Sequence, residues 1–324
     1  MANELLYLSR ADVEAVGLRM SEIIDLVERA FLEKAAGFVE LPPKPGLHPE
    51  GDAFIHAMPA WLSRLQAAGM KWVSGYPQNQ ARGLPYITGL IILNDPATGI
   101  PRAVMDCTWI TAMRTAAATA VSVKHLGRQD AHIMGILGLG VQGRANLEAV
   151  ANVRRITEVR CYDIDHDRQA AFATEMAART GIHITPVDTP RAAVEGCDVV
   201  VTAGPILRNP KPVIEPDWLS PGVVAVPLDF DSYFTAASMR AVDVLVTDDI
   251  PQYLYYQEHG YFQGCPEPHI DLADVVSGKA TAKRHTAADR VMSVNLGVAI
   301  EDIAVADEIY RRATAKNLGR RLPL

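Results

Sequence analysis

The stretch Gly135-Ile-Leu-Gly-Leu-Gly-Val-Gln-Gly143 decides the fold of this chain. Residues 132–137 predict a buried strand that leads into it, and residues 144–151 predict a helix that follows it. In a GxGxxG turn between a strand and a helix, the first glycine makes the tight turn, the second lets the backbone approach a pyrophosphate, and the third lets the helix pack on the strand. The phosphates of a dinucleotide then meet N–H groups at a helix N-terminus. We therefore expect a cofactor to contact Gly138, Gly140, Val141, Gln142 and Gly143.

The residues after this turn indicate which dinucleotide binds. A second predicted strand, residues 158–162, follows the helix and ends at Asp163, twenty residues after Gly143. An acidic residue at this place accepts hydrogen bonds from the ribose hydroxyls of adenosine and repels a 2′-phosphate. A GxGxxG turn alone is weak evidence, but the strand, helix, strand and acid together are specific. The sequence therefore predicts NAD(H) rather than NADP(H).

The composition is that of an ordinary soluble globular protein. Of the 324 residues, 49% are hydrophobic and 21% charged, and the length is sufficient for two domains with sizeable cores. The net charge of −7 gives no indication of a nucleic-acid partner, and apolar runs such as residues 87–93 are too short to span a membrane. The N-terminus lacks the basic start of a signal peptide, and the four cysteines show no metal-ligand spacing. We expect a cytoplasmic protein with buried free thiols and no metal.

The order of the predicted elements indicates an α/β fold with two domains. From residue 131 onward, short apolar strands alternate with helices, which is typical of a doubly wound parallel sheet; the later strands are 183–187, 198–202, 223–228 and, as the last, 242–247. The earlier part combines helices over about 21–37 and 110–126 with extended segments over 53–58, 68–74, 85–93 and 101–105. We therefore predict a Rossmann-type domain over 126–299. An α+β substrate-binding domain over 1–125 is joined by the C-terminal helix, about 300–324.

The strand ends of the Rossmann-type domain predict where the reactive part of the cofactor lies. Ligands of doubly wound sheets bind beyond the carboxyl ends of the strands. We therefore expect the nicotinamide pocket to be bordered by the residues that end or follow two predicted strands: Thr202, Ala203, Leu228 and Asp229.

Three stretches before the glycine turn carry residues suited to chemistry. They are Gly69-Met-Lys-Trp-Val-Ser-Gly-Tyr-Pro-Gln-Asn79, Ala81-Arg-Gly-Leu-Pro-Tyr86 and Thr111-Ala-Met-Arg-Thr-Ala-Ala117. Arg114 lies in an otherwise small and apolar helix, where an arginine is either paired or faces a pocket, because burying it bare is costly. Its planar fork suits a carboxylate. Lys71 and Arg114 therefore either bind a substrate carboxylate or form structural ion pairs.

Together with the glycine turn, these stretches resemble the ornithine cyclodeaminase/mu-crystallin family, and the resemblance continues to Asn295-Leu-Gly-Val-Ala-Ile-Glu-Asp302. The family includes cyclodeaminases, NAD-linked alanine dehydrogenases and ketimine or cyclic-imine reductases. One branch binds thyroid hormone or serves as a lens crystallin. The resemblance implies a Rossmann domain, a second domain for substrate binding and dimerisation, and a homodimer closed by the N-terminal sheets.

The resemblance also implies roles for single residues. Lys71 and Arg114 match positions that bind the substrate α-carboxylate, and Lys44 matches a basic position that helps them. Asp229 falls where cyclodeaminases have their catalytic aspartate. Two further residues match cofactor contacts: Thr115, at the phosphates, and Asn295, at the nicotinamide amide.

Other positions depart from the cyclodeaminase pattern. Cyclodeaminases follow their aspartate with a short Cys-Pro-Gly-Lys-like run, whereas this chain has Phe230-Asp-Ser-Tyr-Phe234, so that Tyr233 stands in place of the lysine. His56 occupies the position of a glutamate, and Tyr86 that of a small hydroxyl residue. His56 is then either a core histidine or a catalytic one that supplies or relays a proton, as Tyr86 could. Glu301 and Asp302 are expected only to cap or decorate the last helix.

Three functions follow from these residues. The first is an NADH-dependent reductase of the imine of a small 2-oxo acid, run in reverse as an amino-acid dehydrogenase. Because His56, Lys44 and Arg82 could bind a second carboxylate, iminosuccinate, which yields aspartate, is a candidate substrate. The second is a cyclodeaminase that converts ornithine to proline and ammonia, and the third is a non-catalytic, crystallin-like ligand carrier.

Overall fold

The computed structural model describes residues 4–279 and 286–324 and divides into two compact units. The first unit comprises Met1–Arg114 and Val298–Leu324, and the second comprises Thr115–Gly297. The division falls within helix α3 (Thr108–Leu126), whereas the sequence analysis expected it after residue 125. The second half of α3 belongs to the second unit because its groups bond there, as Ser122 does with Ser293 and Asn295.

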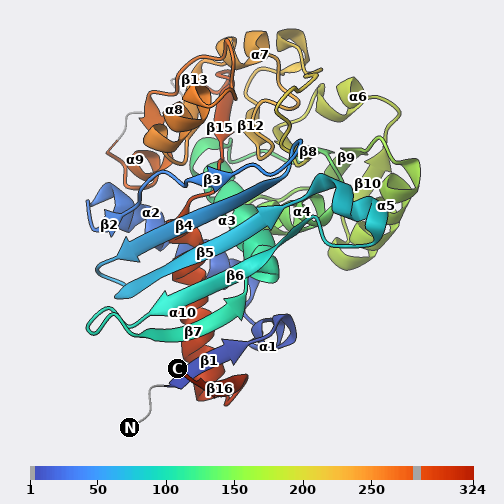
Figure 1. The fold of residues 1–324 in the computed structure, drawn as a ribbon. Coiled ribbons are helices and arrows are strands. Elements are labelled where there is room, and N and C mark those ends of the chain that lie inside the picture. The colour runs from blue at the N-terminus through green and yellow to red at the C-terminus, as the bar shows by residue number, and fades with distance from the viewer. Residues whose placement is uncertain (1–3, 280–285) are drawn as a thin grey trace. The chain divides into compact units, whose positions relative to one another are not determined.

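The first unit is built on a mixed sheet with the strand order β16-β1-β7-β6-β5-β4-β2, and β3 pairs with β4 (Figure 1). Strands β4 to β7 form an antiparallel meander, and β1 is parallel to β7. The predicted extended segments correspond to this meander. The other strands of the sheet are short or lie at the ends of the chain, and their sequences show no clear alternation of apolar and polar residues. The strands are β1 (Glu4–Leu8), β2 (Val39–Glu40), β3 (Gly46–Leu47), β4 (Phe54–Leu62), β5 (Ala67–Gly75), β6 (Ile87–Asn94), β7 (Pro101–Asp106) and β16 (Arg320–Pro323).

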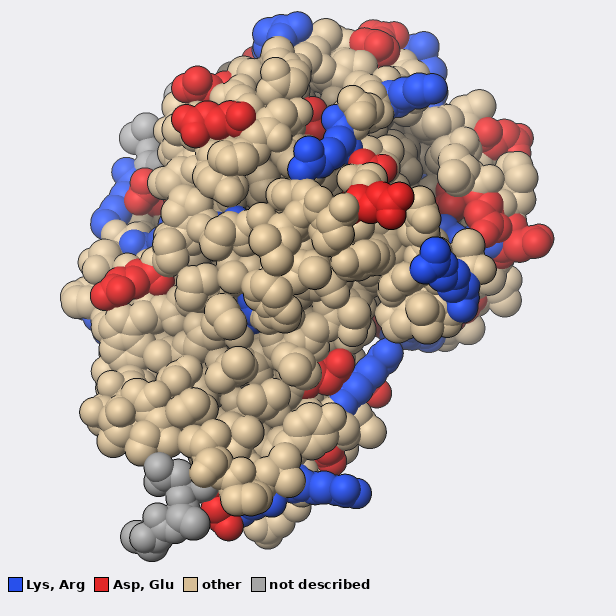
Figure 2. All heavy atoms as spheres, in the orientation of Figure 1, with Lys and Arg blue, Asp and Glu red and all other residues tan. Residues whose placement is uncertain are grey.

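Helices cover one face of this sheet, and the other face is apolar and partly exposed. Helix α10 (Ala299–Ala315) packs on β4, β5, β6 and helix α2 (Met20–Ala35), as expected for the C-terminal helix; α1 (Arg10–Ala15) and the 3₁₀ turn η1 (Pro77–Arg82) complete the unit. Along β4 the side chains alternate strictly between buried and half-buried, which is the pattern of a strand with one covered face. Trp72 and Leu90, which are paired across β5 and β6, are 41% and 43% exposed on the other face. Figure 2 shows few Lys, Arg, Asp or Glu side chains over β4 to β7.

The second unit contains the predicted doubly wound sheet. All its strands are parallel, in the order β10-β9-β8-β11-β12-β15-β13-β14. They are β8 (Ile133–Leu137), β9 (Glu158–Tyr162), β10 (His183–Pro186), β11 (Val199–Thr202), β12 (Val224–Pro227), β13 (Val244–Thr247), β14 (Ile270–Asp271) and β15 (Val291–Val294). The helical elements are α4 (Val141–Val153), α5 (His166–Thr180), α6 (Pro190–Val194), η2 (Pro216–Trp218), α7 (Ala236–Arg240), α8 (Ile250–Glu258) and α9 (Leu272–Val276).

One expectation about this sheet was wrong. The strand predicted over 242–247 is not the last, because β15 lies between β12 and β13, and β14 pairs with the outer side of β13. The sequence Val291-Met-Ser-Val294 is too short to stand out as a strand. In the described residues no helix combines the length and the apolar character needed to cross a bilayer.

Candidate active site

The glycine turn has the geometry that a dinucleotide requires. Gly138 has a φ of +87°, and a Cβ there would lie 2.6 Å from the carbonyl of Ala203. A Cβ at Gly143 would lie 2.6 Å from the carbonyl oxygen of Gly138, so only glycine allows α4 to pack this closely. At Gly140, the N-cap of α4, a Cβ would have nothing within 4 Å. The N-terminus of α4 therefore faces open space, and its first amides have no acceptor within the helix, so a pyrophosphate fits there.

Asp163 follows β9 and bonds to the glycine turn. Its Oδ2 accepts a hydrogen bond from Leu139 N at 2.8 Å, and its Oδ1 accepts one from Asp165 N at 3.0 Å. A carboxylate has about four lone-pair positions, so Asp163 can still accept from ribose hydroxyls. Next to it, the side chain of Ile164 is 82% exposed, and that of Val141, in the turn, is 68% exposed. These two apolar side chains offer a surface that a nucleotide can cover. Ile164 was not predicted as a site residue, although an apolar residue directly after the acid at the strand end is a signal that could have identified it.

Asp229, two residues beyond the end of β12, is fully buried. Thr202 Oγ1 donates to its Oδ1 at 2.7 Å, and Gly204 N donates to its Oδ2 at 2.8 Å. Burial raises the pKa of Asp229 to about 7, although both hydrogen bonds act in the opposite direction. A carboxyl group with a pKa near neutrality can both hold and release a proton at physiological pH, which suits a general acid or base.

An aromatic cluster follows Asp229 in the sequence. Phe230 has a φ of +61°, in the left-handed region, and its ring packs on Tyr256, Tyr261 and Phe262. A non-glycine residue with this φ is uncommon and persists where packing fixes it. The packing of Phe230 therefore anchors the chain directly after Asp229.

Tyr233 lies against the loop that bonds Asp229. A Cβ at Gly204 would lie 2.5 Å from Cε2 of Tyr233, so the ring rests directly on this glycine. Burial, and then the charge of Asp229, raise the pKa of Tyr233, so its phenol stays protonated and can donate a hydrogen bond. In the sequence, Tyr233 stands out only as a departure from the cyclodeaminase pattern, and no site role is predicted for it.

The remaining residues expected to contact the cofactor lie at strand ends or on α3. Ala203 N donates to Leu137 O at 2.7 Å, and Leu228 N donates to Thr202 O at 3.0 Å, so both lie at the edge predicted for the nicotinamide. Asn295 directly follows β15, and its side-chain amide bonds Ser122 and Ser293. Thr115, on α3, is half-buried. Their contacts with a cofactor stay predictions.

The first unit gathers four basic side chains at its sheet. Lys71 is fully buried on β5, and Arg114, on α3, is 6% exposed. His56 on β4 and Lys44, in the loop before β3, are also buried. The pairing of Gly46 with His56 brings this loop onto β4.

Two carboxylates of α10 pair with these cations, contrary to the expectation that they only decorate the helix. Lys71 Nζ lies 2.7 Å from Asp302 Oδ1, and Arg114 Nε donates to the same oxygen at 2.9 Å. Arg114 Nη1 bonds Glu301 Oε2 at 2.6 Å. Both carboxylates are fully buried. The two carboxylates lie 187 to 231 residues along the chain from the cations that they bond, so no local sequence pattern indicates these pairs.

His56 is not cationic in this structure. Binding a second carboxylate of the substrate would require a cationic His56. Burial, and then the nearby charges of Lys44, His48 and Lys71, lower its pKa to about 2. Its ring stacks on Phe54, with a centroid distance of 4.4 Å. In the described structure His56 is therefore a neutral, packed imidazole beside positive charge.

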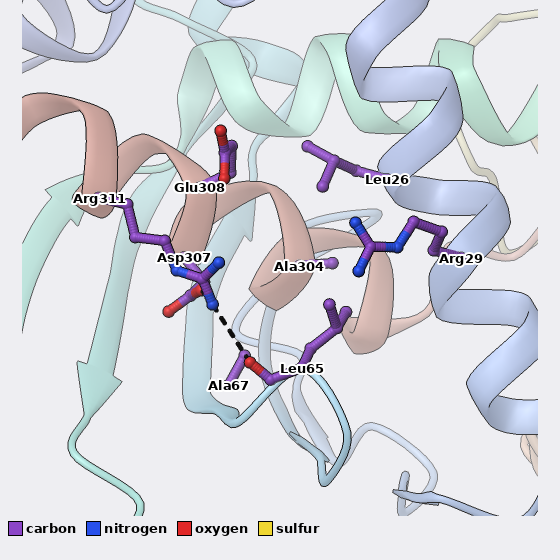
Figure 3. A pocket seen from close by; sticks show the side chains of 8 residues that line it. All are labelled: Leu26, Arg29, Leu65, Ala67, Ala304, Asp307, Glu308 and Arg311. Carbon is purple, nitrogen blue, oxygen red and sulfur yellow. Dashed lines mark hydrogen bonds and ion pairs between the residues drawn. The ribbon is translucent and has the colours of Figure 1, made fainter.

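The other groups considered lie outside this cluster or contribute little to it. Tyr86 is half-buried and Arg82 is exposed. All four cysteines are free and buried, which the sequence predicts for Cys161 and Cys197 because they lie in or beside predicted strands. A small pocket of about 20 Å³ on the first unit (Figure 3) has room for about one water molecule, so we do not regard it as a substrate site. Its lining comes from α2, α10, the turn after β4 and the start of β5: Leu26, Arg29, Leu65, Ala67, Ala304, Asp307, Glu308 and Arg311.

The sequence matches the profile of the ornithine cyclodeaminase/mu-crystallin family over residues 4–317. The chain belongs to this family. A nodulation efficiency protein of Rhizobium meliloti is 35% identical over 97% of this chain and 97% of its own length. The Δ1-pyrroline-2-carboxylate reductase of Thermococcus litoralis, solved with NADH and L-proline, is 34% identical, with a TM-score of 0.88 over 98% of this chain and 99% of its own. An archaeal alanine dehydrogenase dimer, solved with bound NAD, is 30% identical, with a TM-score of 0.87 over 99% of both chains.

Membership of the ornithine cyclodeaminase/mu-crystallin family confirms the resemblance and the Rossmann-type fold that the sequence predicted. The similarity covers both units, so the basic cluster of the first unit and the glycine turn of the second belong to the matched length.

Proposed function

We propose that this family member is an NADH-dependent reductase that converts the imine of a small 2-oxo acid to an amino acid, or runs in reverse as an amino-acid dehydrogenase. The observation that carries the proposal is Asp229, a buried carboxyl group whose pKa lies at about 7 at the nicotinamide edge of the sheet. The relatives solved with NADH and proline, or with NAD, support both the cofactor and the class of reaction.

The charges of the first unit support a substrate with one carboxylate. Counted at their formal charges, Lys44, Lys71 and Arg114 contribute three positive charges and Glu301 and Asp302 two negative ones, while His56 is neutral. The cluster therefore has one net positive charge in surroundings that exclude water, which complements one carboxylate. The guanidinium of Arg114 and the ammonium of Lys71 bind and orient it, and Lys44 assists.

The protein residues then manage the proton that accompanies reduction. NADH, when bound, supplies the hydride to the imine carbon. The imine carbon accepts hydride more readily when the imine nitrogen is protonated, so an anion that stabilises the iminium, or a proton donor, lowers the barrier. Asp229 fills this role, because its carboxyl is close to half-protonated near neutral pH. Lys71, His56 and Tyr86 are the further candidates for supplying or relaying the proton.

A panel of imines tests the proposal. Pyruvate and oxaloacetate with ammonia, and preformed cyclic imines, are each mixed with NADH and the protein, and the nicotinamide absorbance is followed. We expect NADH oxidation with at least one imine and none with the 2-oxo acids alone. Arg114→Gln removes a clamp residue, and Arg102→Gln, which breaks an ion pair of the same unit with Asp307, is its control. Absence of oxidation with every imine would contradict the proposed function, and the ornithine assay described below would then separate a cyclodeaminase from a non-catalytic carrier.

A cyclodeaminase is the second candidate, favoured by the same Asp229. It would oxidise ornithine, lose ammonia on cyclisation and reduce the cyclic imine with the NADH formed. The tyrosine at position 233 and the neutral His56 count against it, since cyclodeaminases have a lysine and a glutamate there. Incubation with ornithine and catalytic NAD, followed by assays for proline and ammonia, separates the two.

The assembly is a homodimer through the exposed face of the first unit's sheet. This face carries Trp72 and Leu90 and few charges, and contiguous apolar surface of this kind is typical of protein interfaces (Figure 2). Trp72→Glu should convert a dimer to a monomer in light scattering. Val213→Glu, at a similarly exposed apolar residue of the second unit, should leave the dimer intact.

A further inference from the structure

We propose that Asp302 is a positioning residue that keeps Lys71 protonated and so sets the pH range in which the basic cluster binds a carboxylate. The catalytic consequence of this inference rests on the proposed function, but the protonation of Lys71 does not.

The geometry concentrates the charge of Asp302 on two cations. One carboxylate oxygen, Oδ1, accepts hydrogen bonds from Lys71 Nζ at 2.7 Å and from Arg114 Nε at 2.9 Å. The second oxygen, Oδ2, is buried and has no hydrogen-bond partner among the residues that the structure describes. In the described structure, Lys71 and Arg114 are therefore the two groups that donate hydrogen bonds to Asp302. A buried carboxylate is costly unless cations of this kind compensate its charge.

Asp302 opposes the two influences that lower the pKa of Lys71. Burial lowers the pKa of Lys71, and the charge of Arg114 lowers it further, whereas Asp302 raises it through its charge and its hydrogen bond. A thiolate at Cys107, directly before α3, would also raise the pKa of Lys71, but burial raises the pKa of the Cys107 thiol to about 11, so this thiol is neutral near pH 7. On the neighbouring strands, Lys71 is paired with the apolar Met58 and Ile91, and His56 on β4 is neutral. The counter-charge for Lys71 therefore comes from α10, through Asp302.

Glu301 provides a matched control on the same helix. It is also fully buried and adjacent to Asp302, but its carboxylate bonds Arg114 at Nη1. Glu301→Gln thus removes one buried charge from the cluster and leaves the hydrogen bond between Lys71 and Asp302. A purely structural role would make the two variants alike.

The direct experiment is an NMR pH titration of lysine side chains in the full-length protein, with Lys71→Met to assign the signal. We expect Lys71 to be protonated at pH 7 in the unaltered protein. Asp302→Asn should lower its midpoint by about 1–3 pH units, the effect of an opposite charge at this distance. Glu301→Gln should lower it less. A neutral Lys71 at pH 7 in the unaltered protein, or equal shifts in the two variants, would overturn the proposal.

Activity adds a second readout. In Asp302→Asn, the loss of kcat/KM at alkaline pH should begin at lower pH, while kcat/KM at acidic pH is retained; Asp302→Glu, which keeps the charge, should restore the profile. Equal loss at every pH would mean that Asp302 only stabilises the fold. If no imine is reduced, the proposed function fails, but the titration of Lys71 still decides this inference. If Asp302→Asn does not fold, the titration of the unaltered protein and of Asp302→Glu remains decisive.

Discussion

Thr202 Oγ1, at the end of β11, donates a hydrogen bond of 2.7 Å to Oδ1 of Asp229, which lies two residues beyond the end of the neighbouring strand β12. The parallel pairing of β11 with β12 brings the two residues to the same edge of the sheet. Because this edge buries Asp229 completely, the hydrogen bond only partly offsets the cost of its charge. The strand order therefore places a titrating carboxyl group where the proposed reaction needs one.

Asp229→Asn should abolish reduction and change the pH dependence of stability. The loss of a general acid or base lowers kcat by about 100-fold or more. In the folded protein the pKa of Asp229 is about 7, above the unfolded value of 3.8, so the folded state binds more protons between these limits. The free energy of unfolding of the unaltered protein is therefore reduced as pH rises through this window, by on the order of 4 kcal/mol at most.

Urea unfolding at pH 5 and pH 8 measures this effect. The variant should gain stability relative to the unaltered protein between the two pH values. A difference in unfolding free energy that is constant with pH would show that Asp229 does not titrate as described.

The parts of the fold that sequence predicted are those with local periodicity. Strands β8 and β9, the glycine turn and α4 follow from a short stretch, in which Gly143 is required by its close approach to Gly138 O. The short strand β15 and the pairing of β1 with β16, at opposite ends of the chain, have no such local signal.

The site was predictable in its residue types but not in their charge states. Lys71, Arg114 and Asp229 are named by motifs, but the partners of Lys71 and Arg114 on α10 depend on a helix far along the chain. The neutrality of His56 depends on burial beside Lys44 and Lys71, which only the fold creates.

Asp163→Asn should relax the preference for NADH over NADPH. The amide can still accept from Leu139 N, but it no longer repels a 2′-phosphate. We expect the ratio of kcat/KM for NADPH to that for NADH to rise about tenfold or more, the equivalent of 1.4 kcal/mol. Asp165→Asn, which alters the cap of α5, is the control and should leave the ratio unchanged. A ratio that rises equally in both variants would exclude a specific role for Asp163.

His56 should take up a proton when a dicarboxylic ligand binds, because a second carboxylate would raise its pKa from about 2. Calorimetry in buffers of different ionisation enthalpy at about pH 6 should detect this uptake with aspartate but not with alanine, and not in His56→Gln. Uptake with neither ligand would remove the dicarboxylic candidate.

The same histidine predicts acid sensitivity. Its folded pKa lies below the unfolded value of 6.5, so the unfolded state binds more protons between about 2 and 6.5. Stability is then lost as pH falls below 6.5. His56→Gln should unfold at lower pH than the unaltered protein in an acid titration followed by circular dichroism, provided that it is as stable at pH 8.

Arg154, which ends α4, should be essential for the stability of the second unit. Its Nη2 donates to the carbonyls of Val123, Lys124 and Gly127 at 2.9 to 3.1 Å, and its Nε donates to Arg128 O at 2.9 Å. These carbonyls lie in the last turn of α3 or directly after it, where the backbone C=O groups of a helix run out of N–H donors from the helix itself. In Arg154→Ala, Val123 O keeps Gly127 N as a donor and Arg128 O keeps Ala131 N, but the carbonyls of Lys124 and Gly127 lose the guanidinium donor. The free energy of unfolding should fall by about 2–4 kcal/mol.

Arg154→Lys should recover only part of this loss, because an ammonium lacks the planar fork that reaches several carbonyls at once. Arg155→Ala, at the exposed neighbouring position, is the matched control and should change stability by less than about 0.5 kcal/mol. Urea unfolding followed by fluorescence and circular dichroism gives all three values. If Arg154→Ala were no more destabilised than Arg155→Ala, water would have to satisfy the end of α3, and the junction between α3 and α4 would not depend on this side chain.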